Sequence, residues 1–294
     1  MSTRSGFVAL AGRPNVGKST LLNRIVGSKV AIVSNKPQTT RRAIRGIATG
    51  PDWQLVVVDL PGVQRPRDSL TRRMQARMER ELSDSDAVVF VLNGEQAVGP
   101  GDRFIARAIR AVAPPTVVAV NKVDLLDRRR TLVALEAAAE LLPGADVFPV
   151  SAQRGAGVPE LVEALVDKLP EGPFLYPPEE QTDLPPSVRV AEIVREKILE
   201  RTRQELPHSV EVEVDETLER EDGLLIVVAR VWADTESQKR ILIGAGGRMV
   251  RDVGSSARRE IEALTGRRVH LELSVRVRPG WRRDEALLDR LGIE

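Results

Sequence analysis

The stretch GRPNVGKST, residues 12–20, decides how the rest of the chain is interpreted. It follows the apolar run FVALA at 7–11, which predicts a buried strand, and it leads into residues 17–26, whose pattern predicts a helix. The stretch matches the spacing G-x-x-x-x-G-K-[ST] with a strand before it and a helix after it. In that arrangement backbone N–H groups surround phosphate oxygens, and the glycines allow the tight turn. The sequence therefore predicts a phosphate-binding loop.

The residues of this loop have different expected tasks. Lys18 would bridge the terminal phosphates of a nucleotide, and the Ser19 hydroxyl would hold a magnesium ion. A side chain at Gly17 would block the phosphates, and the helix that begins there turns its positive end toward the anion. The predicted phosphate cradle comprises Gly12, Asn15, Val16, Gly17, Lys18, Ser19 and Thr20.

Composition sets the outer limits of the interpretation. The chain has 294 residues, enough for two domains, and it has no cysteine, which excludes disulfides and thiolate metal sites. The net charge is only +2, so whole-chain charge gives no argument for nucleic-acid binding. No apolar run is long enough to span a bilayer, and the N-terminus predicts no signal peptide. We therefore expect a cytoplasmic location.

The pattern of the sequence changes near Pro170. Before it, solid apolar strands alternate with amphipathic helices, which predicts an α/β domain over 1–172 with a mainly parallel six-stranded sheet between two helical layers. Residues 173–187 are rich in proline and acid and are interpreted as a linker. The order helix, strand, strand, helix, helix, strand over 188–294 predicts a smaller α+β domain.

A short motif at 121–124, NKVD, bears on the choice of nucleotide. The Asp124 carboxylate can accept hydrogen bonds from the N1 and N2 donors of guanine, which adenine lacks; such sites reject the wrong ligand by about 10⁴-fold. Lys122 would lie over the base, and Asn121 would tie this loop to the phosphate loop. The predicted guanine contacts are Asn121, Lys122, Asp124, Ser151 and the backbone N–H of Ala152.

Together, these motifs resemble the P-loop GTPases over residues 1 to about 170. DLPG at 59–62 is similar to their magnesium-side motif, with Leu60 where a threonine is usual. The resemblance implies that Asp59 binds magnesium through water and that the Gly62 N–H meets the γ-phosphate, which adds both residues to the phosphate site.

The resemblance also bears on the metal and on hydrolysis. It implies that Thr40, in PQTTRR at 37–42, binds magnesium in the GTP state, with Thr39 as the alternative, so the implied metal residues are Ser19, Thr40 and Asp59. Val63 stands where many relatives place a water-orienting glutamine, with Gln64 as a weaker alternative, so we expect slow turnover, as in Ras alone at roughly 10⁻⁴ per second.

Similar GTPases hold a potassium ion at the position of Asn15, and we leave potassium open as a second cofactor beside magnesium. The residues implied in catalysis are Asn15, Lys18, Thr40 and Gly62.

The second domain carries ILIGAGGRMV at 241–250. Two glycines three apart are common, and a corner between helices is the simpler explanation of them. The order of elements, however, resembles the type II KH fold, in which such a loop approaches a nucleic-acid backbone. From Ser237 onward, thirteen Lys and Arg stand against eight Asp and Glu. The implied RNA-binding residues are Lys239, Arg240, Ile243, Gly244, Ala245, Gly246, Gly247, Arg248 and Arg251, with Arg258 and Arg259 left undecided.

One GTPase domain followed by a type II KH domain resembles the Era family of bacterial ribosome-assembly GTPases over nearly the whole chain. The resemblance implies GTP and GDP as ligands, magnesium, and binding of small-subunit 16S ribosomal RNA near its 3′ end. It also implies a role in maturation of the 30S subunit and leaves a peripheral contact with the inner membrane open. Nothing in the sequence demands more than a monomer.

Two other functions are kept as alternatives. Val63 is compatible with a non-hydrolytic, GTP-dependent RNA-binding module. A phosphate loop alone also fits an ATP-using kinase, but the motif around Asp124 argues against that class.

Overall fold

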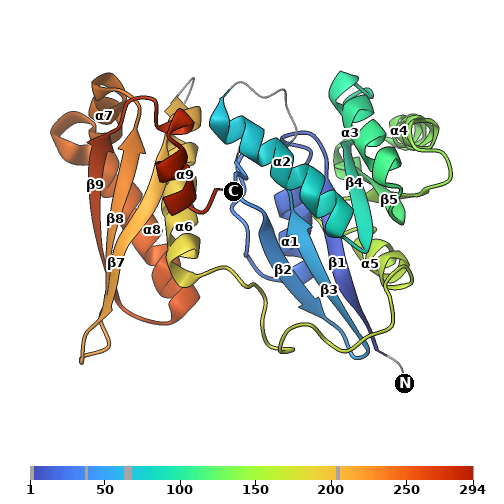
Figure 1. Cartoon of the computed structure of the whole chain (residues 1–294), viewed down its shortest axis with the longest axis horizontal. Helices are drawn as coiled ribbons and strands as arrows, with labels where there is room; N and C mark the ends of the chain where they lie inside the picture. Colours follow the sequence, from blue (N-terminus) through green and yellow to red (C-terminus); the bar gives the residue numbers. More distant parts are fainter. Residues whose placement is uncertain (1–2, 37–38, 63–67, 203–205, 294) are drawn as a thin grey trace. The chain divides into compact units, whose positions relative to one another are not determined.

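The structure is a computed structural model that describes residues 3–36, 39–62, 68–202 and 206–293. Residue contacts divide the chain into two compact units (Figure 1). The first holds most of the chain up to Asp183, and the second holds most of the chain from Leu184 to Gly292. Each unit has its own sheet and its own buried core.

The first unit is built on a six-stranded sheet in the order β2-β3-β1-β4-β5-β6. Its strands are β1 (Arg4–Ala11), β2 (Ile44–Thr49), β3 (Trp53–Asp59), β4 (Ala87–Asn93), β5 (Thr116–Asn121) and β6 (Asp146–Val150). Only β2 runs antiparallel to its neighbour. The prediction of a mainly parallel six-stranded sheet is confirmed, and the continuous apolar runs reflect burial on both faces.

Helices cover both faces of this sheet (Figure 1). They are α1 (Lys18–Val26), α2 (Ser69–Asp84), α3 (Pro100–Val112), α4 (Arg128–Leu141) and α5 (Val158–Val166), with a short 3₁₀ turn, η1, at Val123–Leu125. Met78 of α2, Ile109 of α3 and Ala138 of α4 enter one core with Phe90 of the sheet. Helices α1 and α5 pack together and on the strands as well. The predicted three-layer arrangement is confirmed.

Residues 173–183, part of the predicted linker, pack against the first unit. The buried Gln54 side chain accepts hydrogen bonds from the backbone N–H groups of Leu175 and Tyr176 at 2.8 and 2.9 Å. Asp183 forms an ion pair with Arg45 at 3.0 Å. The stretch is therefore held to the sheet along its length by polar contacts.

The second unit has a three-stranded sheet in the order β7-β8-β9. Its elements are α6 (Pro186–Arg201), η2 (Leu206–His208), β7 (Glu211–Glu219), β8 (Leu225–Ala233), α7 (Glu236–Ile243), η3 (Ala245–Gly247), α8 (Arg248–Thr265), β9 (Val269–Val277), η4 (Trp281–Arg283) and α9 (Glu285–Arg290). β7 and β8 are antiparallel, whereas β8 and β9 are parallel. The predicted order of elements is confirmed; η4 and α9 follow it and were not predicted.

In the part of the chain that the structure describes, no helix is both long and apolar enough to cross a membrane.

The second unit buries a charged cluster beside its apolar core. Arg195 of α6 is fully buried, and its guanidinium donates to both carboxylate oxygens of Glu192, at 2.6 and 3.2 Å. Its Nε also lies 3.8 Å from the carboxylate of Glu211 on β7, which is likewise fully buried. The arginine therefore neutralises two buried carboxylates, and it links α6 to the sheet.

We expect Arg195→Leu to lower the free energy of unfolding by about 3–5 kcal/mol, because removal of one partner leaves buried carboxylates without a counter-charge. Urea unfolding followed by tryptophan fluorescence would measure the loss. Arg201→Leu, at the exposed end of the same helix, is the matched control and should change stability by less than about 0.5 kcal/mol. Equal losses in the two variants would contradict this account.

Candidate functional site

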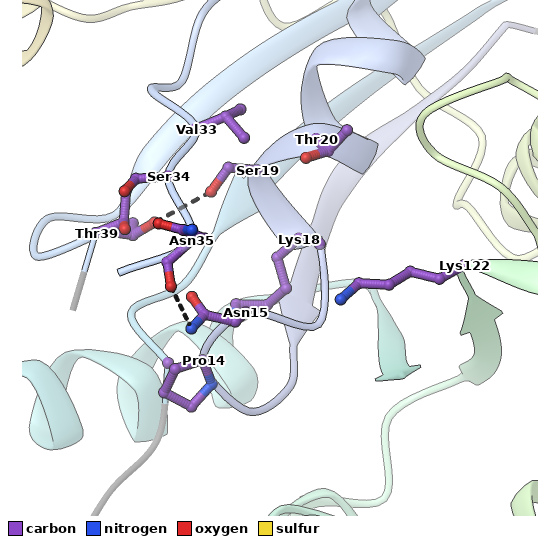
Figure 2. Close-up of a pocket in the computed structure, with 13 residues that line it drawn as sticks. Pro14, Asn15, Lys18, Ser19, Thr20, Val33, Ser34, Asn35, Thr39 and Lys122 are labelled. Atoms are coloured by element: carbon purple, nitrogen blue, oxygen red, sulfur yellow. Dashed lines mark hydrogen bonds between the residues drawn. The ribbon is translucent and has the colours of Figure 1, made fainter. Parts of the chain in front are cut away.

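A cavity of about 240 Å³ lies beside the carboxyl ends of β1 and β3 in the first unit (Figure 2). The carboxyl ends of parallel strands meet at one edge of a sheet, where α/β proteins bind their ligands. The cavity is lined by Pro14, Asn15, Gly17, Lys18, Ser19, Thr20, Val33, Ser34, Asn35, Thr39, Thr40, Gly62 and Lys122. The structure thus gathers the phosphate loop, the segment before β2, the DLPG glycine and the NKVD lysine at one place.

The phosphate loop is folded around the Lys18 ammonium group. Lys18 Nζ donates to the backbone carbonyls of Gly12 and Arg13, both at 3.1 Å. Burial lowers the pKa of Lys18, and the nearby Asp59 carboxylate opposes that shift. An anionic ligand in the cavity would find this buried cation close by.

Gly17 has to be a glycine for two reasons. Its φ angle is 100°, in the left-handed region that side chains disfavour. A Cβ atom there would also lie 2.2 Å from Nδ2 of Asn121. The residue is the N-cap of α1, so its small size lets the helix N-terminus approach the cavity.

Three oxygen-bearing side chains meet beneath the loop. Oδ2 of the fully buried Asp59 accepts from the Ser19 hydroxyl at 2.5 Å and from the Thr40 hydroxyl at 3.0 Å. Its other oxygen, Oδ1, is buried without a hydrogen-bond partner among the described residues. Burial raises the pKa of Asp59, although Lys18 and the two hydroxyls oppose that shift. An unsatisfied carboxylate oxygen beside two hydroxyls is a donor set that suits magnesium.

The two neighbouring threonines differ in what they contact. Thr40 Oγ1 lies 3.2 Å from Ser19 Oγ and also reaches Asp59. The Thr39 hydroxyl instead donates to the backbone carbonyl of Lys36 at 2.6 Å. The geometry therefore favours Thr40 as the metal-side threonine.

Gly62 lies against the phosphate loop. A Cβ atom there would come within 2.8 Å of the Pro14 backbone nitrogen and 2.9 Å of its Cα, so only glycine allows this approach. The positions next to it, Val63 and Gln64, lie outside the described residues, as do positions 37 and 38 of the PQTTRR stretch.

The buried amide of Asn121 joins three loops. Its Nδ2 donates to the carbonyl of Val16 in the phosphate loop at 2.8 Å, and its Oδ1 accepts from the backbone N–H of Ala152 at 2.9 Å. Lys122 follows with φ of 69° and reaches into the cavity, with its Nζ 3.8 Å from Glu95 (Figure 2). The predicted tie between the NKVD loop and the phosphate loop is present.

The remaining predicted guanine contacts do not line this cavity. Asp124 lies on η1, with its carboxylate 3.6 Å from Nε of Arg154. The Ser151 hydroxyl accepts from the backbone N–H of Arg154 at 3.1 Å. Because the Ala152 N–H already donates to Asn121, contact with guanine O6 would require that donor to be shared or exchanged. These roles stay predictions.

Sequence reasoning missed two residues of α1 that support these loops. Asn23 Oδ1 accepts from the backbone N–H groups of Val30 and Ala31, each at 2.9 Å. Arg24 donates to the carbonyls of Ala152 and Gln153 at 3.2 and 2.6 Å. The only sequence signal was their place one turn beyond the phosphate loop.

A second candidate site lies in the other unit, at the turn between α7 and α8. Gly244, Gly246 and Gly247 have φ angles of 72°, 57° and 77°. A Cβ atom on Gly244 would lie 2.7 Å from that of Met249, whereas one on Gly246 would meet nothing within 4 Å. Gly244 thus permits tight packing against Met249, whereas Gly246 leaves the backbone accessible to a ligand.

Arg251 adds a cation beside this turn. Its guanidinium donates to the carbonyls of Gly246 and Gly247 at 2.6 and 3.2 Å. The other predicted basic residues, Lys239, Arg240 and Arg248, lie on α7 and at the start of α8 on either side of the turn.

A groove of about 370 Å³ runs between α8 and β9 in this unit. It is lined by Val250, Arg251, Gly254, Ser255, Arg258, His270, Leu271 and Leu273. The sequence alone left the role of Arg258 undecided and gave no reason to single out His270. The structure places both on the wall of the groove, because α8 and β9 pack side by side.

Two family models match the chain, one in the N-terminal part and one in the C-terminal part. Residues 7–122 match the family model described as 50S ribosome-binding GTPase, and residues 205–282 match the KH domain model. The protein named GTPase Era in Mycobacterium sp. (strain KMS) is 47% identical over 98% of both chains. This chain belongs to the Era family of GTPases. GTPase Era of Lacticaseibacillus paracasei is 46% identical over 98% of this chain and 96% of its own.

Solved structures of Era agree in fold over the whole chain. Two have a TM-score of 0.95 at 35% identity and cover 99% of both chains. One is an Aquifex aeolicus Era variant bound to GDP·AlF₄⁻, and the other is Era with MgGDPNP and nucleotides 1506–1542 of 16S ribosomal RNA. The predicted P-loop GTPase domain, the KH domain and the Era resemblance are therefore confirmed, and the chain is a GTPase.

Proposed function

We propose that this chain is a GTP-hydrolysing switch that binds 16S ribosomal RNA near its 3′ end and assists assembly of the small ribosomal subunit. The observation that carries the switch is the cluster of Ser19, Thr40 and Asp59 beneath the phosphate loop. The cluster joins the loop, the segment before β2 and the end of β3, so a ligand that engages it acts on all three. The Era relative solved with a 16S RNA fragment supports the choice of RNA.

In the proposed reaction, water attacks the γ-phosphorus of GTP, and GDP leaves with its β-phosphate oxygen. Ser19, Thr40 and, through water, Asp59 would hold a magnesium ion, whose positive charge would offset the charge of the phosphates. Lys18 would supply a desolvated positive charge, and the Gly62 N–H would face the γ-phosphate. Val63, being apolar, supplies no water-orienting group, which supports slow turnover and keeps the non-hydrolytic module as the second candidate.

The switch itself would follow from the contacts of Thr40 and Gly62. Thr40 is hydrogen-bonded to Asp59, and Gly62 lies against Pro14, so both segments border the proposed phosphate site. GTP would order these segments and hydrolysis would release them. RNA affinity should then differ between the two nucleotide states, because only differential affinity couples two ligands.

The RNA site we propose is the turn at residues 244–247 together with the groove between α8 and β9. The open backbone of Gly246 suits close approach of a sugar–phosphate chain, and the arginines beside it suit the phosphates. The groove adds the apolar Leu271 and Leu273 and the exposed ring of His270 as surfaces for unpaired bases. We expect the protein to be monomeric and cytoplasmic. Peripheral contact with the membrane stays a prediction.

Asp124→Asn should shift nucleotide preference from guanine to xanthine, because an amide cannot accept the N1 and N2 hydrogens of guanine as a carboxylate does. We expect GTP affinity to fall by about 10²-fold or more and XTP affinity to rise in competition binding. Asp127→Asn, the N-cap of α4 three residues away, is the matched control and should keep its cap and its GTP affinity. Unchanged GTP preference in the Asp124 variant, or equal ATP and GTP binding by the wild type, would refute base reading by this loop.

We also propose that Asn15 helps to hold a potassium ion beside the phosphates. Its Nδ2 donates to the carbonyl of Asn35 at 2.9 Å, while its Oδ1 accepts no hydrogen bond from the described residues. Hydrolysis should therefore be faster in potassium than in sodium, and Asn15→Ala should remove the difference. Equal steady-state rates of phosphate release in the two salts would exclude this role.

A Gly246→Asp, Gly247→Asp double variant should lose RNA binding by about tenfold or more while its GTPase rate is kept, because two carboxylates would face the phosphates. Crosslinking to cellular RNA with sequencing, and titration of a 16S 3′-end fragment with GDP or a GTP analogue, would measure this. Gly223→Asp is the control, since that glycine has φ of 77° and likewise open space. The proposal would be contradicted if the Gly223→Asp control also lost RNA binding, or if RNA affinity were the same with GDP and with the GTP analogue.

A further inference from the structure

One side chain of the phosphate loop is held by a residue far along the chain. Arg13 is not among the residues that line the cavity, yet its Nε donates to Oδ1 of Asp102 at 2.7 Å. Its NH2 group also donates to Oε1 of Gln96 at 3.1 Å. Both partners come from the connection between β4 and α3 and from the first turn of α3, elements that supply no residue to the cavity lining.

Each carboxylate oxygen of the buried Asp102 side chain accepts a hydrogen bond. Its side chain is only 1% exposed, and its second oxygen, Oδ2, accepts from the backbone N–H of Gly99 at 2.8 Å. One oxygen therefore closes the first turn of α3, and the other reaches the phosphate loop. A buried, charge-assisted bond of this kind holds its partners more rigidly than an exposed ion pair does.

Gly101 leaves the space in which Arg13 lies. A Cβ atom on Gly101 would stand 2.7 Å from Cδ and 3.1 Å from Cγ of Arg13. Because the first turn of a helix has no need of glycine, which is a poor helix former, its presence is explained by the arginine stem packed across it. Two neighbouring residues of α3 are thus fitted to one side chain of the loop.

The main chain of Arg13 connects this anchor to the phosphates. Its carbonyl oxygen accepts from Lys18 Nζ, so a shift of Arg13 would displace an acceptor of the buried ammonium group. We propose that Asp102 is a positioning residue for nucleotide binding, which acts through Arg13 on the phosphate loop, and that Gly101 is required to admit Arg13. The inference rests on the nucleotide site proposed above and concerns its phosphate side only.

Three variants test this role, with fluorescent mant-GDP and a mant-labelled GTP analogue as probes. Asp102→Asn keeps an acceptor for the Gly99 N–H but removes the charge toward Arg13. We expect the dissociation constants of both nucleotides to rise about tenfold together, because the loop grips phosphates that the two share, with kcat at saturating GTP changed less than about threefold. Arg13→Gln should match this loss, and the double variant should lose no more than either single variant.

Gly101→Ala separates positioning from stability. Alanine favours the helix, so the melting temperature should stay level or rise, while nucleotide affinity falls because Arg13 is pushed aside. The control is Ile109→Val, a core change near the other end of the same helix that lowers stability. It should leave both dissociation constants unchanged.

The outcomes separate this inference from the function on which it rests. If Asp102→Asn and Gly101→Ala bind both nucleotides as the wild type does, or if affinity follows melting temperature across all variants including Ile109→Val, Asp102 has only a structural role. Additive losses in the double variant would equally overturn it. Failure of the wild type to bind mant-GDP would instead refute the proposed nucleotide site.

Discussion

The buried amide of Asn121 is the interaction on which the architecture of the nucleotide site depends. With one donor and one acceptor it joins the phosphate loop after β1 to the turn after β6, across the intervening strands of the sheet. Both of its bonds go to backbone atoms, so they constrain loop geometry whatever the neighbouring side chains are. A side chain with the same shape but only one of the two functions would leave a buried polar group unpaired.

Burial disfavours the ionised forms of two charged residues in the site. Burial lowers the pKa of Lys18 and raises that of Asp59, so an opposite charge brought by a ligand would stabilise the ionised form of each group. In the proposed complex the phosphates would supply the negative charge near Lys18, and the metal would supply the positive charge near Asp59. Because a ligand that binds only the folded form stabilises it, this unit should be more resistant to unfolding when it is loaded.

The sequence was informative where function imposes fixed spacing. Gly17, Lys18 and Asp59 sit in short motifs whose context of strand and helix could be seen directly, and the alternating pattern indicated the layers of the first unit. The order of elements in the second unit was also predictable, because its strands alternate and its helices are amphipathic.

Other features were not predictable because they join residues without local pattern. Asp102 lies 89 residues from Arg13, and nothing in the stretch around it indicates a partner in the phosphate loop. The groove between α8 and β9 needs the parallel pairing of β8 and β9, which places His270 beside α8. Residues that act through backbone contacts, such as Asn23, carry no motif of their own. The local sequence pattern indicates helices and strands, whereas the contacts between distant helices and strands depend on how these pack together.

The parallel pairing of β8 with β9 has a consequence for how the protein is made. Two α-helices separate these strands in the chain, so β8 has no partner on one side until residue 277 has been synthesised. Until then a nascent chain presents an apolar strand with unpaired backbone groups, which is a template for aggregation. Folding of the second unit should therefore depend on chaperones or on rapid completion of translation.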